Sequence, residues 1–168
     1  MGFKKTSSVV TISNRTTETA LNTFTQAEVD LQLSPLDNEI FVILAIDVSP
    51  QPPDAQAGVN TSTTASVSTT SRTSVGSIGD NNVLGFGEAA IRAAGLVDGG
   101  VGFQQFSGET PTANLDYIGI LATNNFFVQV QGAGNLGAKL ASVRLWGYRA
   151  KADSATYAAL VQSEVLSS

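Results

Sequence analysis

The chain has 168 residues and a net charge of −5, and only 14% of its residues are charged although 42% are hydrophobic. This length and composition are typical of one folded domain with a sizeable core and exclude a disordered chain. The absence of Cys and His excludes disulfides and thiolate metal sites, and it removes the usual base of a serine triad. Enzyme chemistry would have to rest on carboxylates, Lys, Tyr or a cofactor, so we expect a structural or binding protein.

Residues 1–19 form a polar N-terminal segment with three cations, Lys4, Lys5 and Arg15, and no acid before Glu18. The segment is rich in Ser and Thr and has no helical periodicity, so we expect an extended arm. We expect this arm to leave the main domain and to contact neighbouring copies or the inner surface of an assembly. The arm has too few cations for strong binding to nucleic acid.

The clearest strand pattern lies in residues 20–33. Apolar side chains alternate there with polar ones, at Ala27, Val29, Leu31 and Leu33. A period of two with one apolar face predicts a half-buried antiparallel strand. After a turn at 34–38 comes a segment at 39–49. Its residues 40–46 are apolar on both faces and rich in β-branched side chains, which predicts a central strand.

The middle of the chain alternates between turn signals and short ordered segments. Residues 50–54 are rich in Pro and predict a stiff loop. Residues 60–75 are mostly Ser, Thr, Val and Ala, and their β propensity predicts a long strand rather than a linker. We predict a short helix near 88–94 and a short strand at 101–106.

The last third is predicted as strands at 115–122, 126–131 and 140–149, with a glycine-rich hairpin loop at 132–137. Asp153 then resembles a helix N-cap. It precedes a helical spacing of Tyr157, Leu160, Val161 and Glu164. A C-terminal helix of about three turns, packed on a neighbouring surface, is therefore expected.

Seven or eight short strands with two helical interruptions are typical of an all-β antiparallel sandwich. We divide the chain into an N-terminal arm (1–19), the sandwich domain (20–150) and the C-terminal helix (151–168). The predicted core consists of Ala27, Val29, Leu31, Leu33, Phe41, Ile43, Val128, Val130, Val143 and Leu145.

Three carboxylates have alternative interpretations. Glu28 and Asp30 share one strand face about 7 Å apart, a separation that glycoside hydrolysis can use. Gln26 and Gln32 share that face, which favours an ordinary solvated surface. Asp47 ends an apolar run, and it is either a buried acid that needs a partner or, as we favour, a strand-end acid facing solvent.

Two loop motifs match ligand sites in composition but not in context. Asp80, Asn81 and Asn82, together with Asp98, offer oxygen ligands for calcium, but they lack the spacing of an EF-hand and are interpreted as turn formers. The glycines of residues 132–137 have the GxGxxG spacing, but no βαβ unit surrounds them. We therefore predict no catalytic residue, no metal site and no cofactor.

The last predicted strand carries Arg144, Trp146 and Tyr148 on one face, with Lys139 just before it. A basic and aromatic strip of this kind can bind single-stranded nucleic acid. Alternatively, Trp146 and Tyr148 pack under a neighbouring strand, helix or subunit. The candidates for contact between subunits or with an inner surface are Lys4, Lys5, Arg15, Arg144, Trp146 and Tyr148.

An arm, an alternating strand, a central apolar strand, a Pro-rich loop and hairpins of short strands make this chain similar to single jelly-roll capsid proteins. These proteins form icosahedral shells in many viruses, including tailless, membrane-containing viruses of prokaryotes. The resemblance covers about residues 20–150 and rests on architecture and composition. It implies an antiparallel jelly roll of eight strands in two four-stranded sheets, self-assembly and no enzymatic activity. The arm is less basic than in many capsid proteins, which implies weak or no direct nucleic-acid binding.

The expected function is that of a structural protein of the virion, a capsid protein whose copies assemble into an icosahedral homo-oligomeric shell. Its expected partners are copies of itself, with other capsid proteins or an inner membrane as further candidates. The low content of Lys and Glu supports this expectation because protein interfaces are depleted in both. The alternative is an extracellular lectin-like or carbohydrate-binding β-sandwich, which also explains the strands and the loops rich in Asn, Asp and Gln.

Overall fold

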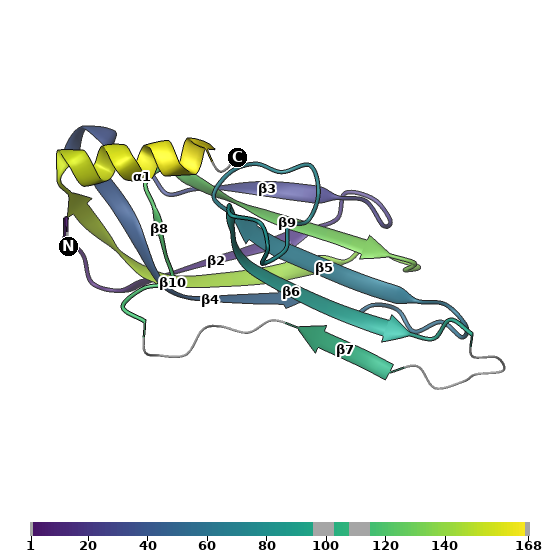
Figure 1. The fold of residues 1–168 in the computed structure, drawn as a ribbon. Helices are drawn as coiled ribbons and strands as arrows, with labels where there is room; N and C mark the ends of the chain where they lie inside the picture. The colour runs from purple at the N-terminus through teal and green to yellow at the C-terminus, as the bar shows by residue number, and fades with distance from the viewer. Residues whose placement is uncertain (1, 96–102, 108–114, 167–168) are drawn as a thin grey trace.

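The computed structural model describes residues 2–95, 103–107 and 115–166, and Figure 1 shows two packed β-sheets with one helix. The first sheet contains β1 (Phe3–Lys5), β2 (Val10–Thr17), β4 (Glu39–Pro50), β8 (Gly119–Leu121) and β10 (Leu140–Ala152). The second contains β3 (Thr25–Asp30), β5 (Thr61–Ser68), β6 (Val83–Arg92), β7 (Phe103–Ser107) and β9 (Asn125–Ala133). The predicted all-β antiparallel sandwich is confirmed, and the described residues form ten strands rather than seven or eight.

The two sheets are built from strands that are distant in sequence. The first has the order β1-β10-β4-β8, and β2 pairs with β10 on the same side as β1. The second has the order β3-β9-β5-β6-β7. A 3₁₀ turn, η1 (Pro35–Asp37), joins β3 to β4, and the helix α1 (Ser154–Leu166) follows β10. The central strand β4 therefore pairs only with strands from the second half of the chain, and the central strand β9 pairs only with strands from the first half.

The main core lies between the two sheets and matches the predicted core closely. Eight of the ten predicted residues are buried in it: Leu31, Leu33, Phe41, Ile43, Val128, Val130, Val143 and Leu145. Val29 is partly buried and packs against this core, and Ala27 is half-buried. The period-two patterns therefore identified the buried faces correctly, because successive strand residues point to opposite sides of a sheet.

A bulge in β4 reverses which side chains of this strand face the core. Ala45 pairs with Trp146 and Ile43 pairs with Gly147, which leaves Leu44 between them without a partner in β10. Phe41 and Ile43 face the core before the bulge, whereas Ile46 and Val48 face it afterwards. The extra residue therefore moves the core-facing side chains from odd positions at the start of the strand to even positions at its end.

A second apolar cluster covers the outer side of the first sheet and explains why β4 begins with apolar residues on both faces. Ile40 and Val42 are buried in this cluster, opposite to Phe41 and Ile43. α1 covers the cluster with the side chains of Tyr157, Leu160 and Val161. Figure 1 shows α1 at the end of the molecule that holds β8. The predicted C-terminal helix is confirmed, including its packing on a neighbouring surface.

Polar contacts hold α1 at both ends. Asp153 accepts a hydrogen bond from the backbone N–H of Thr156 at 2.7 Å, so it is the N-cap that the sequence predicts. Near the other end, the buried carboxylate of Glu164 accepts the N–H groups of Ala122 and Thr123 at 2.6 and 3.0 Å. This carboxylate therefore satisfies two backbone donors where β8 ends.

The expectation that residues 1–19 leave the sandwich as a free arm is wrong for the two strands within them. β1 pairs with residues 150–152 of β10, and β2 pairs with residues 140–147. The segment has little apolar content, but an edge strand needs backbone pairing more than a buried face. These pairings complete the hydrogen bonds on one side of β10.

The predicted helix near 88–94 is also wrong, because β6 continues as a strand to Arg92. Residues 88–92 pair with β7 on one side, and residues 88–91 pair with β5 on the other. Two complete ladders outweigh the modest helix propensity of Glu88, Ala89 and Ala90. The short strand predicted at 101–106 corresponds to β7, although its first two residues lie outside the described residues.

Residues 60–75 form a strand only as far as Ser68, and residues 69–82 then cross the outer face of the second sheet. The backbone N–H of Gly76 donates to the Oγ of Ser66 at 3.0 Å, and that of Arg72 donates to Gln26 at 2.8 Å. Ser66 in turn bonds Gln129, which is fully buried although it points away from the core. The polar outer face is therefore covered by hydrogen bonds rather than by apolar packing.

Candidate functional site

The most distinctive open surface is the outer side of the first sheet beyond the reach of α1, which we call the open face. On it, Arg144 of β10 lies between Ser13 of β2 and Asp47 of β4 in the strand register. Two residues earlier in β10, Ser142 lies between Arg15 of β2 and Ser49 of β4. These residues share a face because they alternate with the core residues Val143 and Leu145 along β10.

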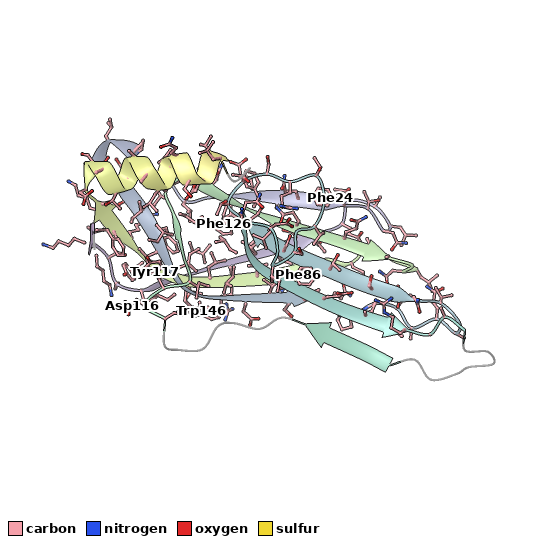
Figure 2. All side chains as sticks on the ribbon, in the orientation of Figure 1. Phe24, Phe86, Asp116, Tyr117, Phe126 and Trp146 are labelled. Atoms are coloured by element: carbon pink, nitrogen blue, oxygen red, sulfur yellow. The ribbon has the colours of Figure 1, made fainter. Side chains whose placement is uncertain are left out.

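Aromatic rings on the open face lie beside cations. The guanidinium of Arg144 lies 6.0 Å from the ring centre of Trp146, and its Nε donates to the Oγ of Ser13 at 3.2 Å. The Nζ of Lys5 lies 4.8 Å from the ring centre of Tyr148. Figure 2 labels Trp146 in the first sheet, well apart from Phe126 in the core. Each ring therefore has a cation within the range of a cation–π interaction.

The structure brings three of the six candidates from the sequence together on this surface: Arg15, Arg144 and Trp146. Lys5 and Tyr148 lie on the same side of the sheet, at the border with the second apolar cluster. The sixth, Lys4, pairs with Lys151 in β1 and points to the other side of the sheet from Lys5. Tyr148 also packs against the second apolar cluster, as the packing interpretation expects. Trp146 is half-buried, and part of it lines an open hollow.

The cations of the open face have no carboxylate partner within the described part of the chain. The ion pairs found there join Arg72 to Asp80, Lys139 to Asp54 and Arg149 to Glu39. Asp47 stands opposite Arg144 in the register, but neither Arg144 nor Arg15 is within 4.0 Å of a carboxylate oxygen. An otherwise acidic protein thus presents, near its one Trp residue, two guanidinium groups that have no carboxylate partner among the described residues.

These side chains surround an open hollow of about 450 Å³. Its lining includes Arg15, Arg144, Trp146, Asp47 and the hydroxyl groups of Ser13, Ser49 and Ser142. A volume of this size is within the range of small-ligand sites. The lining combines one aromatic surface, two cations, one carboxylate and several hydroxyl groups.

A second polar cluster, which sequence reasoning missed, lies at the end of the molecule opposite α1. The buried carboxylate of Glu18 accepts the backbone N–H groups of Gly132 and Lys139 at 2.9 and 2.8 Å. Asn135 is also buried and bonds to Asp54 and Asn22 through its side chain and backbone. In sequence, Glu18 is an acid in a polar segment, and no spacing distinguishes it from an exposed one.

This cluster accounts for the glycine-rich segment 132–137. Its residues turn the chain between β9 and β10, and Gly134 has a φ of +70°, which favours Gly. The backbone N–H groups of Leu136 and Gly137 bind the Oδ2 of Asp54 at 2.9 and 3.2 Å. These donors are occupied within the protein. The prediction of a hairpin loop at 132–137 is wrong, however, because β9 and β10 lie in different sheets and do not pair, so the segment crosses from one sheet to the other.

Asp54 links this loop to a buried cation. Its Oδ1 lies 2.7 Å from the Nζ of Lys139, whose side chain is only 8% exposed. The hydrogen bond from Lys139, followed by those from the backbone of Leu136 and Gly137, lowers the pKa of Asp54 below its ordinary value of 3.8. The ionised form of this carboxylate is therefore favoured in the folded protein.

The substitution Asp54→Asn is expected to destabilise the protein most at neutral pH. Because the folded-state pKa lies below the ordinary value, the carboxylate contributes stability above that value and loses it as the pH falls through the folded-state pKa. The difference in unfolding free energy between wild type and variant should shrink as the pH is lowered below 3.8. Urea titrations across this range measure it, with the exposed Asp116→Asn as control. An unchanged difference at acid pH would contradict the prediction.

The other carboxylates singled out in the sequence are exposed or engaged in turns. Glu28 and Asp30 lie exposed on β3, where Glu28 accepts from Asn125 at 2.6 Å. Asp47 is exposed, as its solvent-facing interpretation predicts. Asp80 accepts the backbone N–H of Ser77 at 2.9 Å and therefore closes a turn. Asp98 lies outside the described residues.

Residues 2–95, 103–107 and 115–166 contain no group of three or more acidic side chains placed to hold a metal ion. They also contain no helix that is long and apolar enough to cross a membrane. The chain matches no family model, no curated protein and no solved structure.

Proposed function

We propose that this chain is a structural protein of a virus particle, a single jelly-roll capsid protein whose copies assemble into an icosahedral shell. The observation that carries the proposal is the order in which the strands pair. Without β1 and β7, eight strands remain. In chain order, the first of these pairs with the eighth, the second with the seventh, the third with the sixth and the fourth with the fifth. The four pairs are β2 with β10, β3 with β9, β4 with β8, and β5 with β6.

This nested set of antiparallel pairs supports the jelly-roll part of the proposal. A chain that forms one long hairpin and then wraps around itself makes these four pairs. Wrapping adds the contacts of β10 with β4 and of β9 with β5, and both are present here. Two Greek keys joined in this way form the jelly roll common in capsid and lectin domains. The strand order thus favours both functions that the sequence suggested over other sandwich classes.

Exposed apolar side chains favour the shell over the lectin. At the end opposite α1, hydrogen bonds between loops join Asn22 to Asn135 and Gln56 to Gly134. Figure 1 shows the β2–β3, β4–β5 and β9–β10 connections together there. These loops expose Leu21, Val59 and Leu136, the last of them 74% exposed. A rigid loop end with exposed apolar side chains suits a repeated contact between copies.

In this arrangement, copies meet through their loop ends, and the open face is left at a surface of the shell. Weak contacts repeated around a closed shell then give a stable particle through multivalency. The low number of charged residues leaves broad neutral strand surfaces, which water solvates less well than a surface rich in Lys and Glu. The expected partners remain copies of the chain, with other capsid proteins or a membrane beneath them.

The purified protein is expected to form particles far heavier than the 17.4 kDa chain, visible by negative-stain microscopy. Leu136→Asp should raise the concentration needed for assembly by about tenfold, because it places a charge in the proposed contact. Ile78→Asp is the matched control, since Ile78 is equally exposed but lies on the loop over the second sheet. Light scattering against concentration measures both variants.

A protein that stays monomeric at high concentration would overturn the shell proposal. If that monomer bound a defined sugar, the result would favour the lectin-like alternative. Equal effects of Leu136→Asp and Ile78→Asp would overturn the assignment of the contact to the loop end.

A further inference from the structure

We propose that the hollow on the open face binds a sugar that carries a carboxylate, such as a uronic acid unit of a polysaccharide. The hollow is complete within one chain, so this inference does not depend on assembly. It is carried by the combination of Trp146, the two unpaired arginines and Asp47. Each of these groups recognises a different part of such a sugar.

Trp146 supplies a flat surface for the apolar side of a sugar ring. Its neighbours across the sheet are Thr11 and Ala45, whose side chains are much smaller than the indole. The ring is half-buried and therefore held in place, while one part of it lines the hollow. The face of an aromatic ring carries partial negative charge, so it attracts the positively polarised C–H groups of a pyranose, as it attracts the positive edge of another aromatic ring.

Arg144 and Arg15 supply the charge that selects an acidic sugar over a neutral one. Arg144 is oriented by its bond to Ser13 and by the Trp146 ring, and its two terminal nitrogens form no hydrogen bond within the described residues. Arg15 is exposed on the neighbouring strand and lines the same hollow. A guanidinium binds a carboxylate through two parallel hydrogen bonds, so an oriented and unpaired Arg is suited to this group.

Asp47 and the serine hydroxyl groups favour a sugar over the other anionic ligands. The hydroxyl groups of a sugar can donate to the Asp47 carboxylate and bond to Ser49 and Ser142, which line the same hollow. The phosphates of a single-stranded nucleic acid have no proton to donate, and Asp47 would repel them.

The test uses the fluorescence of Trp146, which is the one Trp of the chain and therefore reports on the hollow alone. Oligogalacturonate should change this fluorescence and saturate at millimolar concentration, while a neutral galactose oligomer of equal length should bind about tenfold more weakly or less. Arg144→Gln and Arg15→Gln should each weaken binding of the acidic oligomer by about tenfold. Arg92→Gln, which removes an exposed arginine from the second sheet, should leave binding unchanged.

Asp47→Asn separates the proposed ligand from nucleic acid, because the two should respond in opposite directions. The variant should bind the acidic oligosaccharide more weakly, since it keeps only one neutral acceptor oxygen for the sugar hydroxyl groups in place of two charged ones. It should bind a single-stranded oligonucleotide more tightly, since it loses a repulsive charge.

No fluorescence change with the acidic oligomer at about 10 mM would overturn the proposal. Equal binding of the neutral oligomer, or equal losses for Arg92→Gln and Arg144→Gln, would also overturn it. Tight binding of the oligonucleotide that the arginine variants abolish would assign the hollow to nucleic acid instead. None of these outcomes bears on shell formation, which the microscopy of the wild-type protein decides separately.

Discussion

Replacing Gly147 with Ala is expected to lower the free energy of unfolding by about 3 kcal/mol or more. Gly147 lies in β10 beside the bulge of β4, where the two central strands of the first sheet approach most closely. A Cβ at this position would overlap the backbone oxygen of Val42 and would lie 2.6 Å from the ring of Phe41. Neither group can move freely, because one belongs to the ladder and the other is buried in the core.

Gly137→Ala is the matched control for this substitution. A Cβ at Gly137 would meet no atom within 4 Å, so this variant should keep the stability of the wild type to within about 0.5 kcal/mol. Urea denaturation followed by circular dichroism measures both variants. Similar stabilities for Gly147→Ala and the wild type would show that β4 and β10 can separate without cost, against the geometry of the bulge.

Glu18→Ala is expected to cost about 3 kcal/mol, because it leaves two buried backbone donors without an acceptor. The carboxylate binds the N–H groups of Gly132 and Lys139, and an unsatisfied buried donor costs about 1–3 kcal/mol. The change also removes the contact that ties the end of β2 to the β9–β10 loop. We therefore expect faster amide hydrogen exchange in residues 132–139 in addition to the loss of global stability.

Glu28→Ala provides the comparison, since Glu28 is an exposed glutamate whose partner Asn125 is also accessible to water. Its loss should change the unfolding free energy by about 0.5 kcal/mol or less. If Glu18→Ala had an equally small effect, water would have to reach both donors, and the buried cluster would not stabilise the loop end.

The strands that alternate between apolar and polar residues were predictable from the sequence. β3, β9 and the first half of β10 have one apolar face that packs on the core and one mainly polar face, so a period of two identifies both the element and its orientation. β4 was predictable as a central strand, but its bulge was not. The bulge is a property of the pairing with β10. The residue pattern of one strand contains no information about the strand that pairs with it.

Two of the wrong predictions, the free arm and the helix near 88–94, share one cause. β2 and the end of β6 have weak local preferences, and their conformation is set by backbone pairing with strands far away in the sequence. The residue types and spacing of a segment indicate which of its side chains are buried or exposed. They contain little information about which distant strand supplies the N–H and C=O groups that pair with its backbone. Such segments are therefore assigned by topology rather than by propensity.

For the candidate site, the pattern of β10 alone placed Arg144, Trp146 and Tyr148 on one face, because alternation along a strand is a local property. The hollow also needs Arg15 and Asp47, which come from β2 and β4 and reach Ser142 and Arg144 only through the register of the sheet. Glu18 shows the same division, since its role depends on donors more than a hundred residues further along the chain. Fold class, core faces and the aromatic strand follow from short-range periodicity, whereas the pairing order, the bulge and the composition of the hollow arise from long-range backbone hydrogen bonds that no local pattern encodes.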